Sequence, residues 1–338
     1  GGLKESARRE VQERIASGEI NLMVGTHALI QRGVEFDRLG LCVVDEQHRF
    51  GVMQRLELRG KGASPHLLVM SATPIPRTLA LTLYGDMDFS IIDKLPGGRK
   101  KIKTLTIFRD QDALLSLIKE HIGRGEKVFV VFPLIEETEK VDLLSAQNGY
   151  DALVELFGEK CVGLLHGRMK SSEKIDIMDS FAYGDLSVLV STTVIEVGID
   201  VPEASLMVVM NAERFGLSQL HQLRGRVGRG AAASKCVLYT EVPINERLNV
   251  MVKYSDGFDI SQKDFKLRGP GEIMGTAQSG VPPFKLFNVF RDRQLVETAR
   301  KMISSIRKIY DEDAEELKDL NRLVKEYYEQ KMKYSEIL

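Results

Sequence analysis

The sequence predicts an α/β protein with two parallel-sheet domains, the first of them partial, followed by a helical and loop region. Short apolar runs alternate with longer helix-forming stretches, which is the pattern of βαβ units. The segment Leu95–Arg99 interrupts this pattern with a proline and two adjacent glycines, as a linker does. After residue 244 the strand rhythm stops. We therefore expect domains at residues 1–96, 97–244 and 245–338.

The composition is that of an ordinary globular chain, with 43% hydrophobic and 28% charged residues. With a net charge of −1, bulk charge gives no argument for a polyanion partner, so any nucleic-acid site must be a local surface. No apolar stretch approaches the ~20 residues of a membrane span. Three widely separated cysteines form no metal-ligand spacing and fit a reducing cytoplasm. Because the chain does not begin with Met, we expect it to be part of a longer protein.

The first domain is expected to contain few strands. Its strands are predicted at Ile20–Val24, Leu41–Val44 and Leu67–Met70, and its helices at Lys4–Ala16 and Met53–Arg59.

The second domain has a fuller series. Its predicted strands are Thr104–Phe108, Val128–Phe132, Val162–Leu165, Val188–Val190, Met207–Met210 and Cys236–Tyr239. Its predicted helices are Ala113–Ile122, Leu143–Leu156 and Ser172–Ala182, with a cap at Ser171–Lys174.

The C-terminal region is expected to be helical around Leu248–Val252, with a capping box at Ser261–Asp264. Two glycine-rich loops are predicted at Leu267–Glu272 and Gly275–Gly280. Beyond them, apolar residues keep helical spacing over residues 295–309 and 320–328, which predicts core packing.

Two adjacent carboxylates, Asp45 and Glu46, follow the predicted strand Leu41–Val44 directly. An Asp at the carboxyl end of a parallel strand can hold the Mg²⁺ of a bound nucleotide, and a Glu beside it can orient or deprotonate the attacking water. Taken alone, the pair fits an acidic turn equally well.

The stretch Gln219–Gly230 places three arginines within six residues, separated by glycines. Repeated glycine disfavours both helix and strand, and clustered arginines repel one another. The pattern makes sense if a polyphosphate takes up the charge, because arginine forks match phosphate oxygens.

Other predicted strand ends carry hydroxyl, imidazole or guanidinium groups of the kind that contact phosphates. Each of these residues is weak evidence for a binding site by itself. Together they are stronger evidence, because all of them are expected at one edge of each sheet. These residues are Thr26, His27, Ser71, Thr73, His166, Arg168, Thr192 and Thr193.

The order of these motifs resembles that of superfamily 2 helicases, whose motors have two RecA-like domains with ATP between them. Asp45–His48 resembles motif II, Ser71–Thr73 motif III, Thr192–Asp200 motif V and Gln222–Arg229 motif VI. The resemblance implies that Asp45 holds the metal and that Glu46, Arg226 and Arg229 are catalytic, with Arg229 as the arginine finger. It implies nucleotide contacts for Gln47, His48, Gly198, Asp200 and Gln222.

Within this superfamily, Asp45–Val52 and Ser71–Leu79 are similar to the RecG and Mfd translocases. Tyr84–Asp88 and Ile92–Arg99 resemble RecG. The segment Arg268–Gly280 resembles the translocation motif that both families share, with Arg268 and Gln278 as its polar working residues.

The resemblance implies an ATP- and Mg²⁺-dependent translocase on branched double-stranded DNA, at replication forks and Holliday junctions, in recombination and repair. It implies a monomer in the bacterial cytoplasm, with single-stranded DNA-binding protein as a candidate partner and no membrane. An Mfd-like translocase is the alternative within the enzyme class. A non-catalytic DNA-binding module is the alternative outside it, because the sequence contains no Gly-x-x-x-x-Gly-Lys-Ser/Thr loop. For the same reason we expect the chain alone to lack ATPase activity.

Overall fold

The computed structural model describes residues 5–29, 33–45, 61–62, 65–71, 88, 90–92, 100–134, 139–192, 200–230, 232–275, 293–310, 314–315, 317–323 and 325–326. The chain forms two compact units, one of Gly1–Phe89 with Arg268–Leu338 and one of Ser90–Leu267. The division into three domains made from the sequence stays a prediction.

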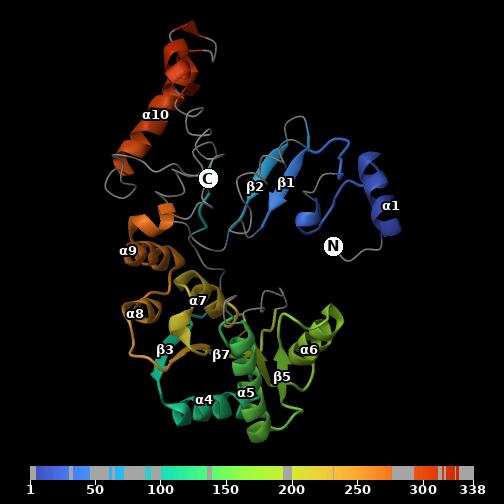
Figure 1. The fold of residues 1–338 in the computed structure, drawn as a ribbon, viewed down its shortest axis with the longest axis vertical. Coiled ribbons are helices and arrows are strands. Elements are labelled where there is room, and N and C mark those ends of the chain that lie inside the picture. The colour runs from blue at the N-terminus through green and yellow to red at the C-terminus, as the bar shows by residue number, and fades with distance from the viewer. Residues whose placement is uncertain are drawn as a thin grey trace. The chain divides into compact units, whose positions relative to one another are not determined.

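The second unit is built on a six-stranded sheet in which every described pair of neighbours is parallel (Figure 1). The strand order is β3-β8-β7-β4-β6-β5. The strands are β3 (Lys103–Phe108), β4 (Lys127–Val131), β5 (Val162–Leu165), β6 (Val188–Ser191), β7 (Ala204–Val209) and β8 (Lys235–Thr240). All six predicted strands are confirmed, and those in the middle of the sheet are buried along nearly their whole length because helices cover both faces.

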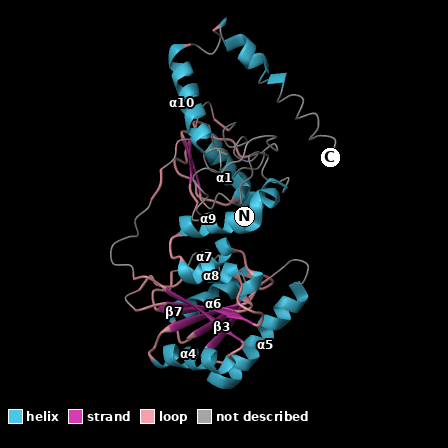
Figure 2. Cartoon of the chain, turned by 90° about the vertical axis from the view of Figure 1, so that its left-hand side faces the viewer, coloured by secondary structure: helices cyan, strands magenta, loops and turns pink. Residues whose placement is uncertain are grey.

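Helices α4 (Gln111–Gly123) and α5 (Glu139–Phe157) pack on one face of this sheet. Helices α6 (Ser171–Tyr183), α7 (Leu217–Arg224) and α8 (Glu246–Lys253) pack on the other (Figure 2). The predicted helices over α4, α5, α6 and α8 are confirmed. The predicted hydroxyl cap of α6 is wrong in detail, since Lys170 precedes the helix and its backbone N–H donates to the Glu173 carboxylate at 3.0 Å.

Helix α7 was not predicted, because its sequence runs into the glycines and arginines of the 219–230 stretch. It forms because Leu217, Leu220 and Leu223 repeat at helical spacing and are buried in the core. Local propensity is thus overridden by packing of one apolar stripe.

Helix α9 (Gly257–Gly275) also differs from expectation. Asp256 accepts backbone hydrogen bonds from Phe258 and Asp259, so the helix begins there and Ser261–Asp264 lies inside it. The loop predicted at Leu267–Glu272 is helical instead. Nothing in the described contacts explains why the backbone stays helical through Gly269–Gly271.

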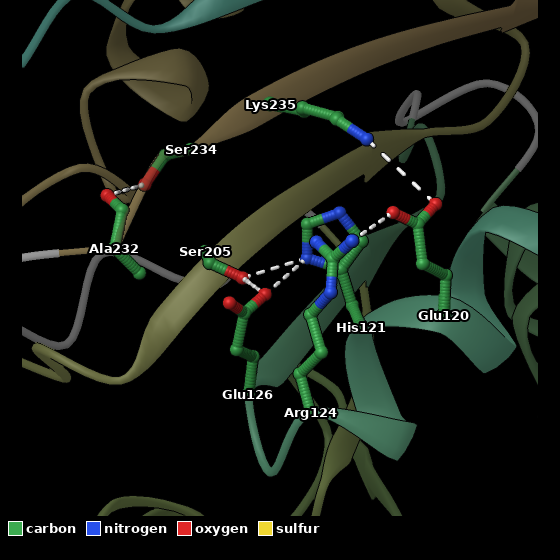
Figure 3. Close-up of polar contacts among 8 residues, drawn as sticks. All are labelled: Glu120, His121, Arg124, Glu126, Ser205, Ala232, Ser234 and Lys235. Atoms are coloured by element: carbon green, nitrogen blue, oxygen red, sulfur yellow. Dashed lines mark hydrogen bonds and ion pairs between the residues drawn. The ribbon is translucent and has the colours of Figure 1, made fainter.

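At the amino end of the sheet, a buried polar cluster fastens α4 to β7 (Figure 3). The Ser205 hydroxyl donates to Glu126 Oε2 at 2.6 Å and accepts from His121 Nδ1–H at 2.7 Å. Burial lowers the pKa of His121, so this fully buried imidazole is neutral. Lys235 and Glu120 form an ion pair beside it at 3.8 Å. The cluster lies at the edge opposite to the predicted site and serves to fix the sheet.

The first unit contains α1 (Glu5–Ala16), a short 3₁₀ turn η1 (His27–Leu29), and the parallel pair β1 (Leu41–Val44) and β2 (His66–Val69). The predicted α1, β1 and β2 are confirmed. The predicted strand Ile20–Val24 is wrong: this segment has no strand pairing, and Leu22 and Val24 are more than 80% exposed. An apolar run without a neighbouring strand has no ladder to join.

Helix α10 (Arg293–Ile309) confirms the helical spacing of the C-terminal stretch, and residues 317–323 are helical as well. The prediction that the apolar residues of this helix pack in a core is wrong. Four of them are each more than half exposed: Leu295, Met302, Ile303 and Ile309.

Candidate functional site

The carboxyl ends of β5 and β6 bring two predicted site residues to one edge of the second sheet. Leu165 pairs with Ser191 in register, and the Thr192 backbone N–H donates to the Leu165 carbonyl at 3.3 Å. His166 and Thr192 therefore follow neighbouring strands at the same level. Open parallel sheets bind their ligands at this edge.

Three buried polar atoms at this edge have no partner among the described residues: His166 Nδ1, Ser191 Oγ and Thr192 Oγ1. Buried polar atoms are nearly always paired in folded proteins, so three together make this edge a candidate for polar contacts. The following turn carries Arg168 in an exposed position, and Lys174 Nζ donates to the Gly167 carbonyl at 2.6 Å to hold it. Ser191, at the same strand end, belongs with the hydroxyl residues that the sequence marks as phosphate contacts.

The arginine-rich stretch begins as helix α7 and continues as a tight turn. Gln222 is half-buried in the helix, and Arg226 lies half-buried in the turn and has an interaction partner. Gly228 has φ +80°, and a Cβ there would lie 2.9 Å from Ile102 Cγ1. A side chain on Gly230 would collide with the Pro202 carbonyl. These two glycines are therefore required to bring the arginines close to the core.

Arg229 lies near Asp200, with Nη1 3.4 Å from Oδ1. Their side chains are 30% and 55% exposed, so the ion pair is weak and can exchange its partner. The structure thus brings together two residues that the sequence assigned to one site.

Arg224 behaves differently from its neighbours in the same stretch. It is 4% exposed and donates to the carbonyls of Met251, Tyr254 and Ser255. Its Nη2 lies 2.9 Å from His221 Nδ1, and burial, together with this guanidinium, lowers the pKa of His221 to about 4. The sequence pattern grouped Arg224 with the arginines expected to meet a polyphosphate, but its guanidinium is buried and already hydrogen-bonded inside the second unit.

Asp142 and Arg214 form a further pair that sequence reasoning missed. The Asp142 side chain is fully buried in the first turns of α5, and its carboxylate lies 2.7 Å from Arg214 Nη1. Arg214 ends the short 3₁₀ turn η4 (Ala212–Arg214) that follows β7. Nothing in the local sequence marks the two, because they are 72 positions apart.

In the first unit, Asp45 and Ser71 follow adjacent parallel strands. Val44 pairs with Val69, and the Met70 backbone N–H donates to the Val44 carbonyl at 2.8 Å. Asp45 and Ser71 are both exposed, and both have interaction partners. Asp45 and Ser71 therefore both lie at the carboxyl edge of this strand pair, as predicted.

Other residues predicted for the site are either placed differently from expectation or not described. Thr26 precedes the turn η1 and its carbonyl accepts from Leu29 N–H, so it follows no strand, contrary to expectation. Several predicted residues lie outside the described residues: Glu46, Gln47, His48, Thr73, Thr193, Gly198 and Gln278. The side chains of His27 and Arg268 are not described either. Among the described residues, no cluster of three metal-ligating side chains occurs.

Three family models match successive parts of the chain. Residues 2–82 match the DEAD/DEAH box helicases and residues 110–231 match the helicase conserved C-terminal domain. Residues 254–337 match the C-terminal part of domain 3 of the ATP-dependent DNA helicase RecG.

An ATP-dependent DNA helicase RecG from Aquifex aeolicus is 50% identical over 99% of this chain and 44% of its own length. The RecG of Escherichia coli K12 is 47% identical over 94% of this chain and 47% of its own length. The chain belongs to the RecG family. It spans less than half the length of these RecG relatives.

Solved structures agree with this assignment. A RecG structure bound to a three-way DNA junction is 42% identical, with a TM-score of 0.64 over 88% of this chain and 39% of that chain. The DUF1998 helicase MrfA bound to DNA is 16% identical, with a TM-score of 0.56 over 76% of this chain and 37% of that chain, and shares the fold alone. In the described part of this RecG-family chain, none of the helices is both long and apolar enough to cross a bilayer.

Proposed function

We propose that this chain supplies the second motor domain, part of the first, and the translocation element of an ATP-dependent DNA helicase that remodels branched DNA. The observation that carries the proposal is identity of about 50% to RecG helicases over nearly the whole chain, with motif residues at the sheet edges. The related structure bound to a three-way junction supports forks and Holliday junctions as substrates. The match to RecG domain 3 favours this reading over an Mfd-like translocase.

In this proposal ATP is the nucleotide that is hydrolysed, and residues of both units are assigned to its hydrolysis. Asp45 supplies a carboxylate for Mg²⁺, which is usually held by one or two carboxylates together with substrate phosphates. Glu46 orients the attacking water, while Gln47 and His48 contact the nucleotide. From the second unit, Gln222, Gly198 and Asp200 contact the nucleotide.

Arg226 and Arg229 neutralise charge on the phosphates. In the resting arrangement Arg229 is paired weakly with Asp200, so a γ-phosphate can take over its guanidinium at little cost.

DNA is held mainly through its phosphates, which makes binding insensitive to base sequence and sensitive to salt. In the second unit we assign the contacts to the edge that carries His166, Arg168 and Thr192, where the buried His166 Nδ1 and Thr192 Oγ1 have no partner among the described residues. The other proposed contacts are Thr26, His27, Ser71, Thr73, Thr193, Arg268 and Gln278.

The test is DNA-stimulated ATPase and fork remodelling by the full-length gene product. We expect ATP turnover to rise when a model fork is added, and the fork to be converted in an ATP-dependent way. Absence of both activities would refute the proposal. The 338-residue chain by itself should show no appreciable ATPase, because its sequence has no phosphate-binding loop.

A non-catalytic DNA-binding module is the second candidate, and the missing Gly-x-x-x-x-Gly-Lys-Ser/Thr motif is what favours it. It predicts salt-dependent DNA binding with no ATP turnover in the full-length gene product. Fluorescence anisotropy with a labelled junction, run beside the ATPase assay, separates the two candidates.

A monomeric state, a bacterial cytoplasmic location and contact with single-stranded DNA-binding protein rest on the family resemblance. Light scattering after gel filtration tests the first. Fractionation of the source cells tests the second. Binding of purified single-stranded DNA-binding protein in a titration tests the third.

A further inference from the structure

Strand β3 lies at one end of the sheet of the second unit, and on its outer side no strand of the described residues pairs with it (Figure 1). The strand order makes β3 and β5 the edge strands of this sheet. The two differ in exposure, since three of the four residues of β5 are buried, whereas none of the six residues of β3 is. The edge of β3 is therefore the more open of the two.

The hydrogen bonds of β3 show which backbone groups face this open edge. The N–H groups of Lys103 and Arg109 donate to carbonyls on the side of β8, at 3.0 and 3.1 Å. Successive residues of a strand direct their backbone groups to alternate sides. The N–H and C=O groups of Thr104, Thr106 and Phe108 therefore point away from β8. An extended chain can pair with such a row of groups and add a strand to the sheet, as in β-augmentation.

The segment that leads into β3 and forms it is strongly basic. Residues 99–109 contain five basic side chains and no acidic one. Lys101 and Lys103 are exposed where β3 begins. Lysines on an edge strand discourage pairing between like copies, and the same charges favour an acidic strand over a basic one. The amino end of this edge therefore fits the carboxylates of a partner.

The other end of the open edge offers an apolar surface. Phe108 is 43% exposed, and Arg109 Cζ lies over its ring, 5.4 Å from the centroid. Arg109 is itself held, because its Nε–H donates to the Glu241 carbonyl at 2.6 Å. An aromatic ring in this position suits an aliphatic or aromatic side chain of a partner.

Two hydroxyl groups between these ends have no hydrogen-bond partner among the described residues. Thr104 Oγ1 and Thr106 Oγ1 are both buried, and they belong to residues whose backbone faces the open edge. In a sheet, hydroxyl side chains directly opposite each other on adjacent strands can form hydrogen bonds. An added strand would place such side chains beside Thr104 and Thr106.

We propose that the open edge of β3 is a docking site for an extended peptide segment of a partner protein, acidic at the end beside Lys101 and Lys103 and apolar at the end beside Phe108. Backbone hydrogen bonds provide the affinity, and the charges and the apolar contact select the sequence. A peptide is favoured over DNA because a row of alternating N–H and C=O groups pairs with another peptide backbone. Strands β8, β7 and β4 separate β3 from β6, so the bound segment leaves the edge at His166 and Thr192 unoccupied.

The test selects peptides from a phage-displayed random library on the full-length gene product and measures their affinity by fluorescence anisotropy. We expect the selected peptides to be rich in Asp and Glu at one end and apolar at the other. Thr106→Pro removes an N–H group from the open edge but no hydrogen bond to β8, so affinity should fall about tenfold or more. Thr106→Val keeps this N–H group and is the matched control, with affinity within about threefold of the wild type.

A charge reversal tests the acidic preference separately. Lys103→Glu should weaken binding of the selected peptides about tenfold at low salt, and by less at high salt, because salt screens exposed charges. Lys160→Glu is the matched control. Lys160 is exposed just before β5, the other edge strand, so its reversal should leave the affinity unchanged.

A measurement on the wild type keeps the test decisive if Thr106→Pro is poorly folded. Binding of a selected peptide should slow hydrogen exchange, resolved by residue, at the N–H groups of Thr104, Thr106 and Phe108. The N–H groups of Leu105 and Ile107 point toward β8 and should exchange at an unchanged rate.

Selected peptides without acidic residues, or failure to select any peptide, would overturn the inference. So would equal affinity of Thr106→Pro and the wild type when both are folded, or unchanged exchange at the open edge. Slow exchange of these N–H groups before peptide is added would show that another segment of the full-length gene product already occupies the edge, which also overturns it. Duplex DNA whose binding is weakened by Lys103→Glu but not by Thr106→Pro, and which displaces the peptides, would assign the lysines to nucleic acid instead.

Discussion

The neutral state of His221 makes the stability of the second unit depend on pH. Its pKa falls from 6.5 to about 4, chiefly through burial and then through Arg224. The folded chain therefore resists protonation that the unfolded chain accepts. The stability that this neutral imidazole represents is complete above pH 6.5 and is lost as the pH falls from 6.5 to 4.

The size of the effect follows from the shift. Two and a half pH units at about 1.4 kcal/mol each give roughly 3.5 kcal/mol between the two limits, of which roughly 2 kcal/mol is lost by pH 5. Asp256 acts in the opposite direction and is already included in the pKa of about 4.

The assay is urea unfolding of the 338-residue chain at pH 7 and pH 5, for the wild type and for His221→Asn. An Asn side chain offers Arg224 an oxygen acceptor but does not titrate, so the variant should lose roughly 2 kcal/mol less between the two pH values. His66→Asn, at an exposed position in β2, is the control and should behave as the wild type. Equal pH dependence in the wild type and His221→Asn would refute the reasoning, as would an imidazole that titrates above pH 6 by NMR.

Four further substitutions test other parts of the structure. Lys127→Met removes a donor to the carbonyls of residues 181, 184 and 186, and should lower the free energy of unfolding by about 2 kcal/mol in urea titrations. Asp142→Asn removes the negative charge that faces Arg214 Nη1 and should cost about 3 kcal/mol in the same assay; a loss below 1 kcal/mol would contradict the importance of this pair. In the full-length gene product, Arg229→Ala should reduce DNA-stimulated ATPase by ~10³-fold, and a near-normal rate would exclude it as the arginine finger. Glu46→Gln should abolish turnover but spare nucleotide binding, measured by equilibrium titration.

The sheet of the second unit was predictable because each strand is a short apolar run bounded by polar residues. Burial on both faces leaves this signal in the sequence itself, as in Val188–Ser191. The placement of His166 and Thr192 at one edge followed from the same logic, since parallel strands end together. The segment Ile20–Val24 shows where prediction from composition fails. Its composition favours a strand, but a strand also needs a neighbouring strand to pair with, which composition does not reveal.

The misses in α7 and α9 have a common cause. Glycines and arginines argued locally against a helix at α7, and glycines with a proline did so at α9, while each helix begins from contacts made by other residues. Three leucines buried against the sheet hold α7, and the Asp256 cap with buried Ile260 starts α9. The leucines of α7 pack on strands distant in sequence, so local propensity alone cannot weigh this packing against the nearby glycines. The Asp142–Arg214 pair escaped for the same reason.

The arginines of motif VI show why helical phase, rather than composition, separates structural from functional residues. Arg224 and Arg226 are two positions apart, yet the first is inside the core and the second lies in the turn beyond α7. Once α7 is known to start at Leu217, Arg224 falls seven residues later, two turns along the same buried face. Arg229 then lies beyond the helix, where Gly228 lets the chain reverse and leaves its guanidinium accessible. The three arginines that look like one phosphate site in the sequence therefore have two roles. Arg224 stabilises the interior, and Arg226 and Arg229 are the residues proposed to bind the nucleotide.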